Sequence, residues 1–396
     1  MKSATRLFVF LVFAVLVLPN LTFAQHYTET ILVSNIPVAG QTPVRDANLQ
    51  NPWGLVSSPT SPWWVSNNAG GTATLYDATG LTKSPPAVPP IAIVLINGTG
   101  IVTIPSAPSQ NGSPGSPTAV MFNGNAADFH LPTTGNPSAR FIFVTEDGTV
   151  QGWAGGASAT IVVDNSVKPT PAKGAVYKGA TIAEIDGKEY ILAANFRSGR
   201  VDVFDSNFKP VELSDEAFGN RHREDEDDAE DEDGRRDFAP FNIQGIGPNI
   251  YVTYAKQDTA KHDPVGGAGL GFVDVFSSKG KLLQRLEHGP WLNAPWGIVL
   301  TPAEFGEFSH TLLVGNFRGG TIAAFNPVTG RFMGNVLNPD GSVVNIGGLW
   351  ALEFGNGGSA GPAHTLFFTA GPDNETDGLL GTLTPVSTEL GENDEQ

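Results

Sequence analysis

The chain has 396 residues, of which 47 are glycine and 30 are proline, and this turn-rich composition excludes a helical bundle. It contains no cysteine, which excludes a disulfide framework, thiolate metal sites and a cysteine nucleophile. The formal net charge of −17 argues against binding to a phosphate backbone, so we expect no nucleic-acid partner.

The first residues are typical of a secretory signal peptide. Lys2 and Arg6 precede an apolar run over residues 7–18, and small residues follow at 22–24. We assign the signal peptide to residues 1–24, with an uncleaved anchor as the alternative. No later segment has the length and apolarity of a membrane span. We therefore expect a protein that is secreted, periplasmic or held at a bacterial cell surface.

A three-strand pattern then occurs six times along the chain. Its middle member is a short β-branched and aromatic run, found as WWVSN (63–67), FIFVTE (141–146), YILAAN (190–195), IYVTY (250–254), TLLVGN (311–316) and TLFFTA (365–370). A strand precedes each run, opened by PWGLV (52–56), PTAVMF (117–122), KGATIAEI (178–185), PFNIQGI (240–246), PWGIVL (295–300) and GLWALEF (348–354). A segment that begins with glycine follows each run, at residues 71, 148, 199, 271, 320 and 378.

Repeated sheets of this size cannot bury their own faces, but they become stable when they stack around an axis. We therefore predict an all-β fold, a six-bladed β-propeller formed by a single domain over residues 25–385. The segment at 26–37 alternates like a strand, and we expect it to close the ring by joining the sixth blade. We expect the acidic residues 386–396 to form a disordered tail.

An acidic insertion at 219–237 separates the third and fourth units. Nine of the ten residues from 224 to 233 are Asp or Glu, and such a run repels itself and cannot be buried. We interpret it as a solvated excursion, with capture of cations or docking to a basic partner as the alternatives.

In an antiparallel blade, the turn between the second and third strands lies on the same face as the start of the first strand. Polar and aromatic residues gather at these places. The candidate ligand-binding residues are Trp53, Asn67, Glu146, Asp147, Asn195, Arg197, Trp296, Asn316, Arg318 and Trp350. The alternative is structural, because Asn suits tight turns and the tryptophans can pack between blades.

The sixth unit offers a partial calcium-loop motif in GPDNETDGLLG, residues 371–381. Asp373, Glu375 and Asp377 alternate as oxygen ligands do, and Gly378 follows at the sharp turn. The bidentate Glu expected at the twelfth position is replaced by Thr384. The motif is therefore a weak candidate for Ca²⁺ or another divalent cation, with a polar hairpin turn as the alternative.

Several phrases together resemble a family of uncharacterised secreted bacterial proteins, some of them linked by name with PEP-CTERM sorting. They are NPWG, APWGIVLTP, TEDGTVQGW, the NFRSGRVDVFD/NFRGGTIAAFN pair, FAPFNIQ and GLWALEFGNGG. More distantly, the units resemble NHL-repeat and gluconolactonase-like propellers, and the latter hold a central divalent cation. The resemblance implies a six-bladed fold and export, and it implies no particular activity.

Two functions remain open on sequence alone. The first is a binding or scaffold module that recognises a glycan, a peptide or a surface protein at one face of the channel. The second is a divalent-metal-dependent hydrolase or lactonase, with a channel cation ligated by Glu146, Asn195 or Asn316. The sequence does not decide whether the protein is an enzyme, and we expect a monomer.

Overall fold

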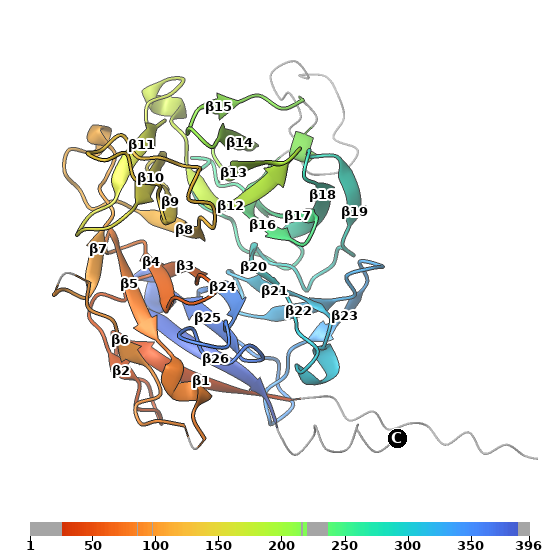
Figure 1. Ribbon diagram of the computed structural model, residues 1–396. Coiled ribbons are helices and arrows are strands. Elements are labelled where there is room, and N and C mark those ends of the chain that lie inside the picture. Colours follow the sequence, from red (N-terminus) through yellow and green to blue (C-terminus); the bar gives the residue numbers. More distant parts are fainter. Residues whose placement is uncertain (1–25, 85, 97, 215–216, 220–236, 387–396) are drawn as a thin grey trace, which may run out of the picture.

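The protein folds into six small sheets arranged around one axis, as shown by a computed structural model that describes residues 26–84, 86–96, 98–214, 217–219 and 237–386 (Figure 1). The prediction of a six-bladed β-propeller is confirmed. The predicted signal peptide (1–24) lies outside the described residues. So do the acidic insertion and the tail, apart from Gly219, Asp237 and Val386.

Each blade is built from strands that follow one another outward from the axis. The inner strands are β3 (Pro52–Val56), β8 (Pro117–Phe122), β12 (Tyr177–Ile185), β16 (Phe238–Ile246), β20 (Pro295–Leu300) and β24 (Leu349–Phe354). The second strands are β4 (Trp63–Asn67), β9 (Phe141–Thr145), β13 (Lys188–Asn195), β17 (Asn249–Lys256), β21 (Leu312–Asn316) and β25 (Leu366–Ala370). The third strands are β5 (Thr72–Asp77), β10 (Thr149–Trp153), β14 (Arg200–Asp205), β18 (Gly271–Ser277), β22 (Ile322–Phe325) and β26 (Leu379–Pro385).

The outer strands are short because the rim of a propeller exposes one sheet edge per blade. They are β6 (Ala92–Ile93), β11 (Thr160–Asp164), β15 (Pro210–Val211), β19 (Leu282–Arg285) and β23 (Phe332–Asn335), and β7 (Ile101–Thr103) also pairs with β5. The described helices are single turns: α1 (Pro372–Glu375) and the 3₁₀ turns at Thr79–Thr82, Pro108–Gln110, Pro171–Lys173, Ala217–Gly219 and Gly306–Phe308. None of them is long and apolar enough to span a bilayer.

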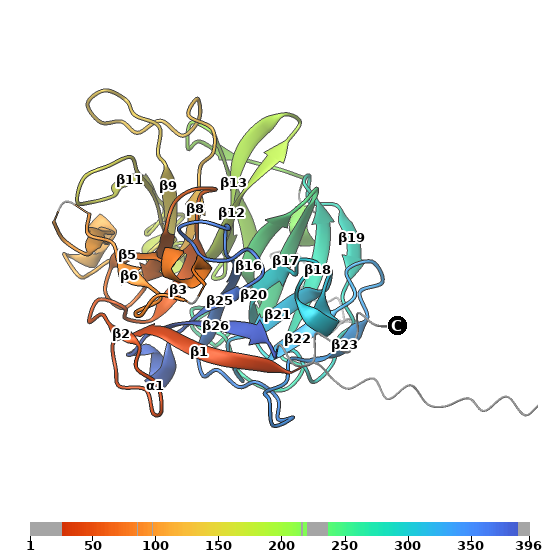
Figure 2. The same ribbon diagram turned by 60° about the horizontal axis from the view of Figure 1, so that its bottom comes forward.

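The N-terminal strand closes the ring, as predicted. β1 (Tyr27–Ser34) pairs antiparallel with β26, and β2 (Val44–Arg45) then adds parallel to β1 (Figure 2). The outer edge of the sixth blade is thus supplied by the start of the described chain. This pairing ties the first and last blades together through backbone hydrogen bonds.

The core consists of apolar layers between neighbouring blades. Each inner strand packs beside the inner strands of both neighbours, so the ring is continuous. The aromatic residue that recurs in the third strands is fully buried at Tyr76, Phe204 and Phe325, where it fills these layers. Each such burial contributes about 1.5–3 kcal/mol, which explains why a single blade would not be stable alone.

All six inner strands carry a β-bulge against the second strand of their blade, close to the first residue. A bulge sets two residues opposite one and redirects a side chain. The bulge therefore defines one equivalent position per blade. In chain order it holds Trp53, Thr118, Lys178, Phe241, Trp296 and Trp350.

Candidate functional site

Aromatic residues from five blades close the channel at the end where the inner strands begin. The ring of Trp350 stacks on Trp53 at 3.6 Å between centroids and on Phe317 at 3.9 Å, while Trp296 meets Trp350 edge-on at 5.7 Å. Phe196 and Phe241 complete this group, which we call the aromatic plug. The three predicted tryptophans are thus brought together, but each is at most 4% exposed. In this structure their faces pack on one another and are covered from solvent.

Lys178 occupies the bulge position at which three other blades place tryptophan. Its side chain is completely buried, and its Nζ lies 5.2 Å from the centroid of the Trp53 ring. The ammonium donates a short hydrogen bond to Glu146 Oε1 from the second blade and another, at 3.0 Å, to Asp263 Oδ1 from the fourth. A buried cation is tolerated only when it is paired in this way. We call Lys178, Glu146 and Asp263 the ion triad.

The pairing stabilises the charged forms of Lys178 and Asp263. Burial opposes the charge on Lys178, but attraction by Glu146 and Asp263 outweighs it and raises the pKa of the ammonium. The pKa of Asp263 lies well below its usual value, first because His262 Nδ1 hydrogen-bonds the carboxylate at 3.0 Å and then because Lys178 lies beside it. Burial of the ammonium is thus compensated by its partners, and Lys178 is held as a cation.

On the same side of the plug as the ion triad, polar groups from the first and sixth blades extend its hydrogen-bond network. Glu146 Oε2 accepts a hydrogen bond from Asn68 Nδ2 at 2.7 Å, and Asn51 Nδ2 donates to Asn68 Oδ1 at 3.3 Å and to Glu375 Oε2 at 3.1 Å. Burial, and then the negative charge of Glu146, raise the pKa of Glu375. Asn51 also accepts from Trp350 Nε1 at 2.9 Å, so the network is anchored to the plug.

Glu375 lies in a segment whose backbone has an uncommon conformation. Asp373, Asn374 and Glu375 have φ values of 51°, 56° and 68°, so α1 is a left-handed turn. Each non-glycine residue in this conformation costs about 1–2 kcal/mol. Within the described residues, Asp373, Glu375 and Asp377 do not converge as a three-ligand metal group. Their carboxylates instead serve local contacts, such as Asn35 Nδ2 to Asp377 Oδ1 at 3.3 Å.

The three predicted asparagines hold turns. Asn67 Nδ2 donates to Thr74 Oγ1 at 3.0 Å within the first blade. Asn195 Nδ2 donates to Asp202 Oδ2 at 3.0 Å, while its Oδ1 accepts from two backbone amides. Asn316 links the backbone of Asn293 and Trp291 at 2.8 Å each. Each of these residues is at most 7% exposed, and its side-chain amide is engaged in these contacts.

Arg197, Asp147 and Arg318 lie on the same face. Arg197 is half-buried and donates from Nη1 to the carbonyl of Gly174 at 3.0 Å. Asp147 accepts from the backbone amides of Ala107 and Ser116, which fixes the long loop before β8. Arg318 stacks on Phe317, with its Cζ 4.5 Å from the ring centroid.

A polar cavity of about 240 Å³ opens beside the ion triad, between the loops of the second, third and fourth blades. Its lining residues are mostly hydroxyl, amide and charged groups: Gln110, Ser113, Pro114, Ser116, Glu146, Asp147, Ser166, Ala175, Arg197 and His262. We call it the mouth cavity. Three of the ten predicted ligand-binding residues, Glu146, Asp147 and Arg197, therefore line one cavity.

Two proteins of Acanthamoeba polyphaga mimivirus are similar to the chain over most of its length. Uncharacterized protein R648 is 29% identical over 371 residues, which are 89% of this chain and 78% of that protein. Uncharacterized protein L690 is 30% identical over 352 residues, which are 85% of this chain and 81% of that protein. The chain belongs to the L690 family.

No protein-family model matches this member of the L690 family. Among solved structures, a glucose dehydrogenase superposes with a TM-score of 0.47 at 13% identity, covering 90% of this chain and 99% of that one. The two relatives are viral, so the bacterial origin expected from the sequence stays a prediction.

A divalent cation does not fit the ion triad as it stands. Glu146, His262 and Asp263 offer ligand atoms within 4.8 Å of one another, which is the spacing of a metal site. The Lys178 ammonium, however, already pairs with Glu146 and Asp263 at the point where such a cation would bind, and it offsets one of their two negative charges. A dication would have to displace or deprotonate Lys178, whose pKa is raised. In this member of the L690 family the lysine itself supplies the positive charge.

Sequence reasoning missed Lys178, His262 and Asp263. Lys178 stands in an ordinary strand pattern, and its acidic partners are 32 and 85 residues away. His262 and Asp263 lie in the loop between β17 and β18, which is longer than the other second-to-third-strand turns. The one available signal was the alignment of the inner strands, where lysine replaces an aromatic residue.

Proposed function

We propose that the protein is an exported binding module that recognises an acidic sugar residue of a glycan in the mouth cavity. One observation carries the proposal: the acidic side chains of the cavity are already used within the protein. Glu146 binds Lys178 and Asn68, and Asp147 binds two backbone amides. The groups left for a ligand are therefore mainly hydrogen-bond donors.

The chemistry of these donors favours a carboxylate. A guanidinium presents a planar fork that can bind a carboxylate through two hydrogen bonds, and Arg197 spends one nitrogen on Gly174 while lining the cavity. His262 is held through Nδ1 by Asp263, which leaves Nε2 for the ligand. Arg197 stands in the turn held by Asn195, and the backbone N–H of His262 donates to Asp258 Oδ1 at 2.8 Å, so both groups are pre-organised.

The remaining lining favours a sugar over an apolar side chain. Ser113, Ser116, Ser166 and Gln110 offer hydroxyl and amide groups, which match the hydroxyls of a sugar ring. The apolar lining is limited to Pro114 and Ala175. Export is the other part of the proposal, and the pattern at residues 1–24 supports it because glycans are displayed outside cells.

A glycan array tests the proposal. We expect the purified protein to bind glycans ending in a uronic or sialic acid and to ignore their neutral counterparts. Arg197→Ala should lose that binding by at least about tenfold, since a charge-assisted pair contributes about 1.5–3 kcal/mol. Arg331→Ala is the matched control, because Arg331 is exposed in the hairpin between β22 and β23. Preference for neutral glycans, or for peptides on a parallel array, would count against the proposal.

The metal-dependent hydrolase is the second candidate, because the 4.8 Å cluster of Glu146, His262 and Asp263 would offer three ligands to a divalent cation that displaced Lys178. Elemental analysis together with thermal melts in the presence and absence of chelator separates the two functions. The binding module, in which Lys178 supplies the positive charge of the ion triad, predicts no stoichiometric metal and a melting temperature that the chelator leaves unchanged. One tightly bound divalent ion per chain, lost with a fall in melting temperature, would favour the hydrolase.

A further inference from the structure

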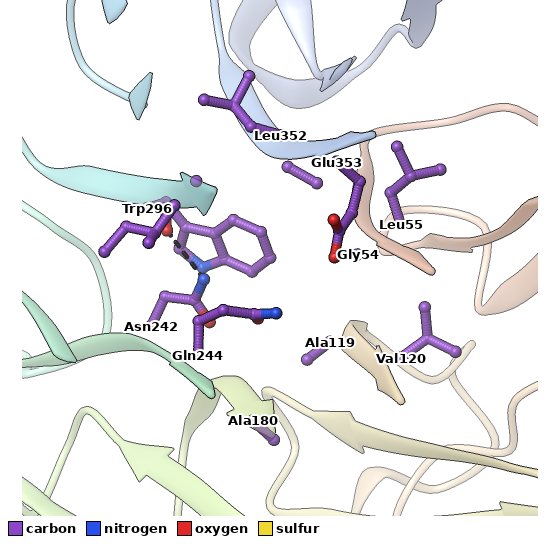
Figure 3. A pocket seen from close by; sticks show the side chains of 13 residues that line it. Gly54, Leu55, Ala119, Val120, Ala180, Asn242, Gln244, Trp296, Leu352 and Glu353 are labelled. Atoms are coloured by element: carbon purple, nitrogen blue, oxygen red, sulfur yellow. Dashed lines mark hydrogen bonds between the residues drawn. The ribbon is translucent and has the colours of Figure 1, made fainter. Parts of the chain in front are cut away.

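Beyond the aromatic plug, the channel contains one isolated carboxyl group. Residues from all six inner strands line a small cavity there, and most of them are Gly, Ala or aliphatic residues. Figure 3 shows the carboxylate of Glu353 on β24 directed into this space, and the side chain of Gln244 extending into it from β16. Among the described lining residues, Glu353 is the only titratable one.

This cavity is separate from the mouth cavity. Glu353 follows the plug residue Trp350 by three positions along β24, and Gln244 follows Phe241 by three positions along β16. At about 3.3 Å per residue, both side chains stand about 10 Å further along the channel than the plug. They are therefore approached from the opposite face of the propeller.

The carboxyl group of Glu353 is costly to ionise where it stands. Burial raises its pKa from the usual 4.5 to about 7, although the backbone N–H of Phe354 hydrogen-bonds the ionised form. No positively charged side chain contributes to this balance. At neutral pH the fold therefore holds a partly ionised carboxylate without a counter-charge among the described residues that line the cavity.

We propose that this channel cavity binds one monovalent cation, with the Glu353 carboxylate as counter-charge and the Gln244 side-chain oxygen as a second ligand. The volume of about 40 Å³ suits a small ion with one or two waters, since a bound water needs about 10–15 Å³. The inner strands are the edges of their sheets, and backbone carbonyls of such edges are the kind of ligand that suits Na⁺, K⁺ or NH₄⁺. A dication normally requires more than one carboxylate, and only one is present.

The site is tested by thermal melts of the full chain at pH 8 and constant ionic strength. Tetramethylammonium chloride, whose cation is too bulky for the cavity, is replaced in turn by NaCl, KCl and NH₄Cl. We expect at least one small cation to raise the melting temperature by about 2–4 °C. The increase should fall below about 1 °C at pH 5, where Glu353 is protonated, and it should vanish in Glu353→Gln.

Glu184→Gln is the control, because Glu184 is exposed on β12, and it should keep the full cation response. A second measurement does not depend on any variant: cation binding near pH 7 must release protons from Glu353 in weakly buffered solution. Equal melting temperatures in all four salts, a response that Glu353→Gln retains, or no proton release would each overturn the proposal.

Discussion

Lys178 shows that a charged side chain can occupy a position that other blades fill with an aromatic one. In three blades the bulge position is filled by an indole, and in the third blade it is filled by an ammonium held between Glu146 and Asp263. The aromatic neighbours are kept, since Nζ still lies 5.2 Å from the Trp53 ring. The lysine therefore joins the apolar plug to the charged loops above it.

Lys178→Met should destabilise the fold by about 3–5 kcal/mol, because it leaves Glu146, whose side chain is only 13% exposed, without a counter-charge. Chemical denaturation measures the loss, and the exposed Lys188→Met is the control. The double variant Lys178→Met/Glu146→Gln should recover part of the lost stability.

The same ion pair predicts a pH dependence. Since the pKa of Lys178 is raised above 10.5, the stability that the charged lysine contributes is complete below that pH and is lost as the pH rises through the folded value. A Lys178→Met variant as stable as the parent would contradict the role of Lys178 as the counter-charge of Glu146.

Glu353→Gln should stabilise the fold, in contrast to Lys178→Met. The folded pKa of about 7 exceeds the usual 4.5, so the folded state binds the proton more tightly and its stability falls as the pH rises from 4.5 to 7. In tetramethylammonium salt, the variant should be about 1–3 kcal/mol more stable than the parent at pH 8 and equal to it at pH 4. Denaturation curves at the two pH values measure the difference in the free energy of unfolding between variant and parent. A difference that does not change with pH would show that ionisation of Glu353 is not its cause.

Among the strands, β1 closes the ring of blades by pairing with β26. Tyr27 is fully buried in it, and its hydroxyl donates to the carbonyl of Phe305 at 2.8 Å in the neighbouring fifth blade. Tyr27→Ala should cost about 3–5 kcal/mol, whereas the exposed neighbour Thr28→Ala should cost little. Thermal unfolding measures both, and equal effects would show that closure does not depend on this contact.

The acidic insertion is expected to be dispensable for the fold. A run of nine acidic residues among ten repels itself and gains nothing from burial. Deleting residues 224–233 should therefore leave the melting temperature within about 2 °C. A large decrease, seen by differential scanning calorimetry, would mean that the run makes stabilising contacts.

The strands themselves were predictable, since alternation and turn residues are local properties. PWGLV and WWVSN correspond to β3 and β4 residue for residue, and the closing strand was placed in the correct blade. The site was only partly predictable, because its contacts join residues far apart in sequence. Glu146 was found through its position in a repeated turn, while Lys178 and His262 break the repeat and gave no local signal.

For the whole molecule, the symmetry of the fold explains where its charges collect. Six blades bring six second-to-third-strand loops to one face, and the plug prevents their polar groups from entering the channel on that side. The mouth cavity and the channel cavity are consequently two separate sites on opposite faces. A net charge of −17 makes the donor-rich mouth cavity a local exception on an acidic molecule.

The central claim is that the mouth cavity recognises a carboxylate through Arg197. Calorimetric titration with an oligosaccharide that ends in a uronic acid, and with its methyl ester, tests this most directly. The account predicts that the parent protein binds the acid at least about tenfold more tightly than the ester, and that Arg197→Ala binds the two equally. Equal affinity of the parent protein for acid and ester would contradict it.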